Sequence, residues 1–337
     1  QLFFPEPSKQ ENFHGPASIT AKIDLLGVSL PGKGDWFFTP PPFCFAAQHS
    51  AGWMSMGVEA QPGENLFTEY LYHGSPGAFY LSLSYEGYTQ VSGRRKLPAI
   101  GFDFADSDYS AVEAHVTSLR SAGYAPSPHP VDRPEWWYAP IFCGWGAQCQ
   151  LYYAKGGKSA DYCRQELYDG FLSSLEQHGI IPGTIVLDDK WQAEYGTNRV
   201  DVQKWPDLRG FIDRHHAAGR KVLLWLKAWD PEGVPPDECI RNQAGAKVSV
   251  DPTSPGYERR FREAIDFMLS EEGYNADGFK VDFTARVPSG PGFCTYEPLW
   301  GMELMRRYLS ILYSQAKHTK PDALVMTHTP HPYLADL

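Results

Sequence analysis

Hydrophobic and polar positions alternate in short stretches along the first 130 residues, and glycine and proline separate these stretches. Such spacing is typical of short antiparallel strands joined by tight turns. The pattern therefore predicts an N-terminal antiparallel β-sandwich over residues 1–130. Strands are expected at residues 19–28, 36–38, 52–58, 67–72 and 79–85, and one helix is expected at 109–122.

From Trp136 onward, short and continuous apolar runs alternate with longer segments whose apolar residues recur at helical spacing. Such an alternation indicates a parallel sheet covered by helices. A (β/α)8 barrel is favoured over a doubly wound sheet, because no glycine-rich dinucleotide fingerprint follows the first strand. Strands are expected at 139–144, 184–187, 221–226, 277–283 and 323–327, and helices at 161–178, 207–218, 257–270 and 298–317.

The two patterns predict a multidomain chain, with a β-sandwich domain at 1–130 and the N-terminal part of a (β/α)8 TIM barrel at 131–337. A proline-rich stretch at 126–134 would link them. Only about five of the eight strands of a barrel are found. A barrel that stopped at Leu337 would leave two sheet edges unpaired. We therefore expect a fragment of a longer protein, or strands supplied by a partner chain.

The net charge of −10 and the lack of a long Lys/Arg block argue against nucleic acids and anionic membranes as partners. No apolar run is long enough to span a bilayer. Six dispersed cysteines form no CxxC pair and have no zinc spacing, so disulfides are left open. The chain begins at Gln1, which fits removal of a leader, and a secreted or periplasmic location is favoured over a cytoplasmic one.

Asp282 ends the fourth predicted strand of the barrel, and Lys280 precedes it by two residues. Because strand side chains alternate, both should point the same way. A nearby ammonium keeps a carboxylate ionised, and an ionised carboxylate at the C-terminal end of a barrel strand suits a nucleophilic glycosidase. On this segment alone, a structural ion pair is the alternative.

The other predicted strands also end in charged and aromatic residues, which in a barrel would line the same face. Carboxylates and ammonium groups bind vicinal sugar hydroxyls, and aromatic faces suit sugar rings. Structural alternatives exist: the aspartates could cap turns, the tryptophans could pack inside the barrel, and Lys227 could pair with Asp230. The predicted substrate-binding residues are Asp188, Asp189, Lys280, Trp145, Trp191, Trp225 and Lys227.

Two histidines after the fifth predicted strand, His328 and His331, raise the possibility of a metal site, because His and Asp at barrel strand ends bind zinc in many hydrolases. Such barrels usually carry an His-x-His after the first strand, and none is found here. We therefore predict neither a metal ion nor a cofactor.

Four segments carry a family resemblance in a fixed order, at 142–145 (Phe-Cys-Gly-Trp), 179–182 (Gly-Ile-Ile-Pro), 186–192 (Val-Leu-Asp-Asp-Lys-Trp-Gln) and 277–282 (Asp-Gly-Phe-Lys-Val-Asp). Together they resemble glycoside hydrolase family 36, the α-galactosidase and raffinose-synthase group, from about Trp136 to the end of the chain. Residues 205–213 are also similar to the α-glucosidases of family 31, which belong to the same clan.

The resemblance implies a retaining mechanism in which Asp282 is the nucleophile and Lys280 contacts sugar hydroxyls. It further implies that Asp188 and Asp189 grip the non-reducing sugar. In the family the general acid/base is an aspartate after a sixth strand, which is expected beyond Leu337.

Trp145 and Trp191 match aromatic positions that lie beside the sugar in the family. The chain departs from the family at Lys190, where the family often has glycine, and a charged side chain there would alter the pocket rim.

The sequence thus predicts a retaining α-glycosidase, most similar to an α-galactosidase, which hydrolyses a terminal α-linked sugar through a covalent glycosyl-enzyme. Its partner would be an oligosaccharide or glycoside substrate, and an oligomer is possible. The alternatives are an α-galactosyl transglycosidase of the raffinose-synthase type and a non-catalytic carbohydrate-binding protein.

Overall fold

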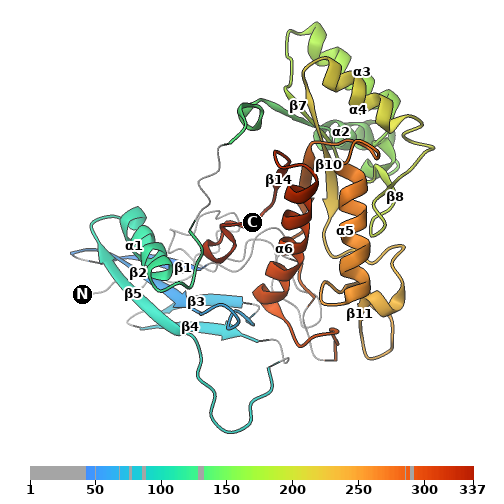
Figure 1. Ribbon diagram of the computed structural model, residues 1–337. Coiled ribbons are helices and arrows are strands. Elements are labelled where there is room, and N and C mark those ends of the chain that lie inside the picture. The colour runs from blue at the N-terminus through green and yellow to red at the C-terminus, as the bar shows by residue number, and fades with distance from the viewer. Residues whose placement is uncertain are drawn as a thin grey trace. The chain divides into compact units, whose positions relative to one another are not determined.

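The computed structural model describes residues 43–49, 51–67, 69–75, 78–85, 89–127, 133–284, 286–288 and 292–337 (Figure 1). It divides into two compact units. The first consists of Gln1–Pro130, Phe283–Arg307 and His328–Leu337, and the second of Val131–Asp282 and Tyr308–Thr327. Residues 283–307 and 328–337, which were expected in the barrel domain, thus group with the first unit. The division into two domains at residue 130 stays a prediction.

The first unit contains antiparallel strands, as its alternating pattern indicates. A three-stranded sheet has the order β1 (Cys44–His49), β2 (Gly52–Glu59), β5 (Ala99–Ala105), and β3 (Glu69–Ser75) pairs with β4 (Ala78–Ser84). The strands expected at 19–28 and 36–38 lie outside the described residues. β1 and β5 were not predicted.

Helix α1 (Asp108–Ser121) covers the three-stranded sheet of the first unit. It begins at a cap in which the Ser107 side chain accepts a hydrogen bond from the Ser110 N–H. Its buried residues include Ala111, His115 and Leu119. A Cβ atom added to Gly57 would lie 2.1 Å from Nε2 of His115, so the close approach of this helix to β2 requires glycine there.

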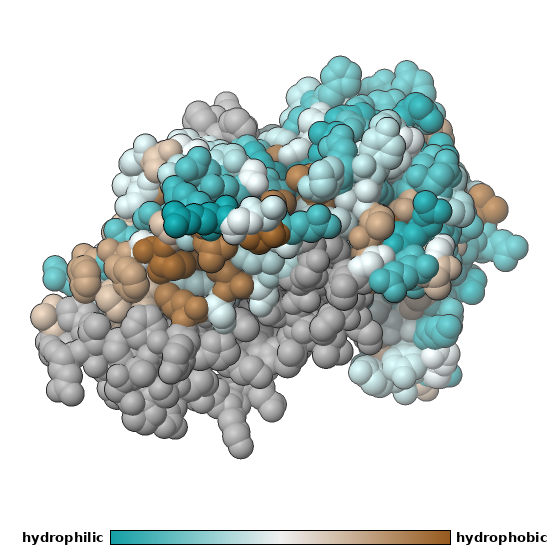
Figure 2. All heavy atoms as spheres, turned by 90° about the horizontal axis from the view of Figure 1, so that it is seen from below, coloured by the Kyte–Doolittle hydropathy of each residue, from teal (hydrophilic) through white to brown (hydrophobic). Residues whose placement is uncertain are grey.

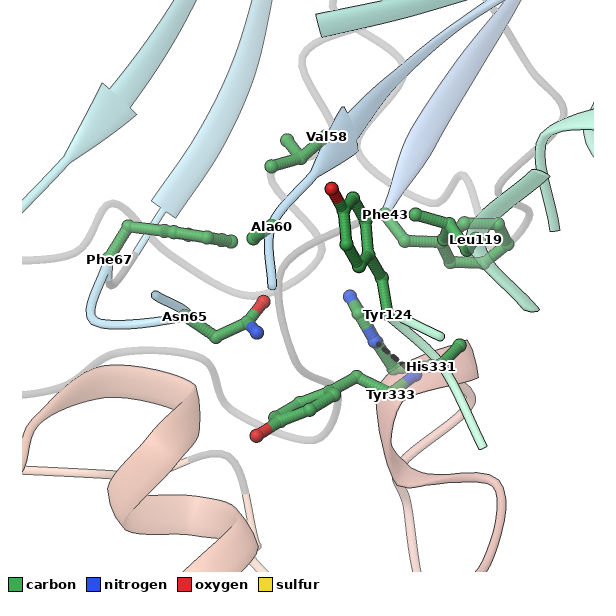
Figure 3. Close-up of a pocket in the computed structure, with 10 residues that line it drawn as sticks. Phe43, Val58, Ala60, Asn65, Phe67, Leu119, Tyr124, His331 and Tyr333 are labelled. Atoms are coloured by element: carbon green, nitrogen blue, oxygen red, sulfur yellow. Dashed lines mark hydrogen bonds between the residues drawn. The ribbon is translucent and has the colours of Figure 1, made fainter. Parts of the chain in front are cut away.

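The C-terminal turn η4 (Pro332–Leu334) closes a small pocket in the first unit (Figure 3). Nδ1 of His331 accepts a hydrogen bond from the Tyr333 N–H at 3.1 Å, and the Tyr333 hydroxyl donates to Oε2 of Glu303 at 2.7 Å. Oε1 of Glu303 accepts from the backbone N–H groups of Gly63 (2.8 Å) and Asn65 (3.0 Å). The cavity measures about 10 Å³, which is room for about one water molecule.

Acidification should destabilise this unit through His331. Burial, and then the neighbouring His115, lower the pKa of His331 to about 3, whereas an unfolded histidine titrates near 6.5. The folded chain therefore binds fewer protons than the unfolded chain below about pH 6.5, and stability falls as the pH drops toward 3. We expect His331→Asn, which keeps an acceptor for the Tyr333 N–H, to weaken the loss of stability between pH 7 and pH 4.5. Urea unfolding at both pH values measures this, and an unchanged pH dependence would contradict it.

The second unit is built on a five-stranded parallel sheet whose spatial order follows the chain. The order is β6 (Ile141–Cys143), β7 (Thr184–Leu187), β10 (Lys221–Lys227), β13 (Gly278–Asp282), β14 (Leu324–Met326). Each new strand is added on the same side, which is how a (β/α)8 barrel winds, whereas a doubly wound sheet reverses direction. The order of the five strands is therefore that of part of a (β/α)8 barrel.

Helices connect these strands, as the alternating pattern predicted (Figure 1). They are α2 (Trp145–Lys155), α3 (Gln165–Gln177), α4 (Leu208–Ala217), α5 (Pro255–Leu269) and α6 (Gly301–Thr319). Of these, α2 was not predicted. Two small hairpins were also missed, β8 (Gln192–Glu194) with β9 (Arg199–Val200), and β11 (Cys239–Arg241) with β12 (Lys247–Val250). Short 3₁₀ turns lie at η1 (Glu135–Tyr138), η2 (Ser159–Tyr162) and η3 (Pro236–Glu238).

One face of the parallel sheet packs against the helices. Its side chains are at most 1% exposed: Ile185, Leu187, Leu224, Leu226, Phe279 and Val281. Burial of these branched and aromatic side chains removes apolar surface from water and fixes the register of the strands. The opposite face is thereby presented as the inner face of the barrel.

On the face drawn in Figure 2, the described surface differs between the two units. Hydrophobic residues gather over the first unit in Figure 2, whereas hydrophilic residues predominate over the second. Phe102 and Phe104 of β5 are 47% and 64% exposed. All six cysteines are free thiols. None of the helices in the described parts of the chain combines the length and the apolar character needed to cross a membrane.

Candidate functional site

The strand register brings five of the predicted site residues, Asp188, Trp225, Lys227, Lys280 and Asp282, to one face. Between β10 and β13, Trp225 lies opposite Lys280, and Lys227 lies opposite Asp282. Between β7 and β10, Val186 lies opposite Leu223. Residues two apart along a strand share a face. The polar side chains at the C-terminal end of this inner face are therefore Cys143, Asp188, Lys227, Lys280 and Asp282.

Lys280 on β13 and Asp188 at the end of β7 form an ion pair across the intervening strand β10. Nζ of Lys280 lies 2.7 Å from Oδ2 of Asp188, whose side chain is 2% exposed. The Cys143 thiol donates to the same oxygen at 3.0 Å. Burial lowers the pKa of Lys280, but the charge and hydrogen bond of Asp188 outweigh it and raise that pKa above its usual value. Burial and the adjacent Asp188 raise the pKa of Cys143 to about 11, so the thiol stays protonated and acts as a donor.

A chain of buried hydrogen bonds fixes the backbone of Asp188. Its backbone N–H donates to the Tyr168 hydroxyl at 2.9 Å, and that hydroxyl donates to Oε1 of Gln148 at 2.8 Å. A Cβ atom on Gly144 would lie 1.9 Å from the Tyr168 hydroxyl oxygen. Glycine after β6 is thus required for Tyr168 to reach the end of β7.

Asp282 is oriented by an indole. Nε1 of Trp225 donates to Oδ2 of Asp282 at 3.1 Å, and the Trp225 ring is 2% exposed. Nε1 of Trp191 donates to the Trp225 carbonyl at 2.7 Å, and Trp191 is fully buried. Neither ring offers a face on which a sugar could stack. Trp225 instead contacts the carboxylate, and Trp191 packs beneath it. A substrate-binding role for either residue stays a prediction.

Asp189 has a different partner from its neighbour. Its Oδ1 accepts a hydrogen bond from the Tyr195 hydroxyl at 2.7 Å. Burial raises the pKa of Asp189, although the hydrogen bond from Tyr195 opposes this. Lys227 pairs with Asp230 at 2.8 Å, which is the structural alternative considered for it. Trp145 begins α2 and is 40% exposed.

Backbone strain gathers at the ends of three neighbouring strands. Lys190 (φ 72°), Trp229 (φ 69°) and Phe283 (φ 60°) adopt left-handed conformations shortly after β7, β10 and β13. For bulky residues this costs about 1–3 kcal/mol each and persists at functional sites more often than elsewhere. Lys190 stands where the resembling family often has glycine, the residue that adopts this conformation without cost.

The histidines that raised a metal hypothesis lie in the first unit. His331 is buried there and accepts the hydrogen bond from Tyr333. Within the parts of the chain that the structure describes, no group of three or more His, Cys, Asp or Glu residues is placed to hold a metal ion.

Sequence reasoning missed three residues that contact the predicted site: Cys143, Tyr168 and Tyr195. Cys143 could have been found, because it ends a predicted strand within a matched segment. Tyr168 lies inside a helix and Tyr195 in a hairpin turn, and neither position carries a pattern that would single it out.

Comparison with known proteins gives distant relatives among α-glycoside-acting enzymes. No family model matches the chain. It is 24% identical over 151 residues to α-xylosidase XylQ of Lactiplantibacillus pentosus, a match that covers 39% of this chain and 19% of the relative. The narrower resemblance to family 36 stays a prediction, and the relative is named for xylose rather than galactose.

Two solved enzymes have a similar fold. The cycloalternan-degrading enzyme of Trueperella pyogenes, solved with isomaltose, aligns with a TM-score of 0.59 at 13% identity and covers 86% of this chain and 43% of the enzyme. The cycloalternan-forming enzyme of Listeria monocytogenes, solved with a pentasaccharide substrate, gives 0.56 at 14% identity, over 84% and 28%. This chain therefore spans less than half the length of either enzyme, and the likeness is one of fold.

Proposed function

We propose that this chain is part of a retaining α-glycoside hydrolase in which Asp282 is the nucleophile. The observation that carries the proposal is the arrangement of side chains on the inner face of the sheet. Asp282 ends β13 and accepts a hydrogen bond from the Trp225 indole N–H. Lys280, two residues earlier on the same strand, forms the ion pair with Asp188. Catalytic residues of barrels lie at this end of the strands. The distant match to an α-xylosidase supports the same reaction class.

In the proposed first step, a carboxylate oxygen of Asp282 attacks the anomeric carbon and forms a glycosyl ester. The glycosidic bond breaks, and a second carboxylic acid donates its proton to the leaving oxygen. Water then attacks the same carbon, gives up a proton to that group and releases Asp282. The two carboxyl groups of a retaining enzyme lie about 5–5.5 Å apart, and the second is expected after a sixth strand.

The neighbours of Asp282 have distinct roles in this proposal. The Trp225 N–H fixes one carboxylate oxygen and so orients the group toward the anomeric carbon. Lys280 would donate to sugar hydroxyls, as charged groups do in polar recognition, and the buried Asp188 carboxylate would hold its ammonium in place. Asp189 would accept a hydrogen bond from a further sugar hydroxyl.

Two kinds of evidence bear on which sugar the enzyme releases. The sequence resemblance points to α-galactosides, whereas the match to an α-xylosidase and the fold shared with an enzyme solved with isomaltose favour α-xylosides or α-glucosides. The cycloalternan-degrading enzyme has also been solved with a covalent intermediate, which supports a covalent step in this fold.

The proposal is tested by release of 4-nitrophenol from its α- and β-xylosides, glucosides and galactosides, using the protein that contains this chain. We expect release from α-glycosides alone, and NMR during the first minutes should detect the α-anomer of the free sugar. Initial formation of the β-anomer would contradict a retaining mechanism.

Transfer to a sugar acceptor remains the alternative reaction at the same site. Added acceptor would then yield a new oligosaccharide in place of free sugar. Binding of sugar without any turnover would favour the non-catalytic alternative.

A further inference from the structure

Tyr195 lies in the turn between β8 and β9 and is held at both ends. Its hydroxyl donates to Oδ1 of Asp189 at 2.7 Å, and its backbone N–H donates to Oε2 of Glu232 at 2.9 Å. The hairpin turn is thereby tied to the ends of two barrel strands, because Asp189 follows β7 and Glu232 follows β10.

Two ammonium groups lie over the Tyr195 ring. Nζ of Lys190 is 3.8 Å and Nζ of Lys227 is 4.1 Å from the ring centroid. Each lysine is itself anchored, Lys190 by Glu232 at 2.6 Å and Lys227 by Asp230 at 2.8 Å. Cations are attracted to the electron-rich face of an aromatic ring, so these contacts restrict the ring to one orientation.

The backbone of Lys190 shows that this arrangement is maintained against strain. At φ 72° the residue is in a conformation that a lysine adopts rarely. Observed strain of this kind persists where the surrounding contacts over-determine it. Here those contacts are the ion pair with Glu232 and the approach to Tyr195.

Tyr195 also lies near the candidate nucleophile. Its ring centroid is 5.9 Å from that of Trp225 in an edge-to-face contact, and Trp225 donates to Asp282. One side chain thus contacts both Asp189 and the indole that orients Asp282.

We propose that Tyr195 is a positioning residue for substrate binding: its hydroxyl fixes the Asp189 carboxylate as an acceptor for a substrate hydroxyl, and Lys190 and Lys227 hold its ring in place. The inference rests on the proposed glycosidase function and deepens it. Because the Tyr195 hydroxyl acts through Asp189, its removal should change substrate binding more than the chemical step.

Removal of the hydroxyl should also change how binding depends on pH. The charged groups that face Asp189 are Asp188 and Lys190 on the same turn and Lys227 on β10. Burial raises the pKa of Asp189, and the Tyr195 hydroxyl counters it by stabilising the carboxylate. Without this donor the pKa of Asp189 rises further, and the carboxylate is lost at a higher pH.

The test is Tyr195→Phe, which removes the hydroxyl and keeps the ring beneath the lysines. We expect KM to rise roughly tenfold with kcat changed less than about threefold, since a lost hydrogen bond to a charged group has this size. The acid limb of kcat/KM should move to higher pH. The matched control is Tyr162→Phe, which removes a hydroxyl that donates to the Gly156 carbonyl at 2.7 Å and should leave KM unchanged.

A second variant, Lys190→Gly, relieves the strained backbone while it removes one cation from the ring. A rise in KM without loss of stability supports the positioning role, because a residue that only stabilises the fold would not separate these two readouts. Wild-type turnover with an unchanged KM and acid limb in Tyr195→Phe would overturn the inference and leave the glycosidase function standing. Absence of wild-type turnover on any glycoside would overturn the proposed function and the inference with it.

Discussion

Replacement of Asp282 by asparagine is expected to lower kcat for every glycoside that the protein hydrolyses by roughly 10⁴-fold or more, the size of effect seen when an enzyme loses its nucleophile. An amide accepts the Trp225 N–H as the carboxylate does, so the fold should persist. Initial-rate kinetics measure the loss, and circular dichroism checks the fold. Residual activity within tenfold of wild type would contradict the assignment.

Two further variants separate a nucleophile from a merely structural carboxylate. Asp213→Asn changes an aspartate that pairs with Arg209 on the surface of α4 and should retain full activity. Asp282→Ala opens space for a small anion such as azide or formate. If Asp282 is the nucleophile, the anion should restore turnover of activated substrates, with azide yielding the β-glycosyl azide.

Lys280→Met should destabilise the protein by about 3 kcal/mol, because it leaves the Asp188 carboxylate buried without its cation. The carboxylate is 2% exposed, so water cannot replace the ammonium. The hydrogen bond from the Cys143 thiol remains, which places the effect at the lower end for a broken buried pair. Urea unfolding of the wild type and the variant measures the difference.

The double variant Asp188→Asn/Lys280→Met provides the control, since it removes both charges together. It should recover most of the stability lost in Lys280→Met. Equal destabilisation in the single and double variants would mean that the methionine fits the site poorly and that the charge is not responsible.

The strands of the parallel sheet are readily predicted from the sequence, because they are short, apolar and buried on the helix-facing side. β7 was predicted with its observed bounds, Thr184–Leu187, all of which are buried. Helix α2 was missed because it has little apolar periodicity: its buried residue is Gln148, while Tyr153 is 80% exposed. Its position depends on tertiary hydrogen bonds to Tyr168 and Asp189, which a local pattern does not contain.

The candidate site was predictable to the extent that strand alternation determines it. Lys280 and Asp282 follow from the period of two, but the partner of Lys280 is Asp188, 92 residues away. The complete burial of Trp191 does not follow from the sequence pattern. Trp191 follows a left-handed turn at Lys190, and a lysine gives no sign of such a turn as glycine would.

The ion pair of Asp188 has a consequence for the order in which the chain folds. Asp188 follows β7, and its partners Cys143 and Lys280 lie on β6 and β13, so the three groups belong to three separate strand–helix repeats. A folding intermediate that contains only the first two repeats would bury the Asp188 carboxylate beside Cys143 without any cation. Burial of an unpaired charge is costly, so the end of β7 should stay hydrated until β13 docks. Assembly of the inner face and neutralisation of its charge would then be a single late event.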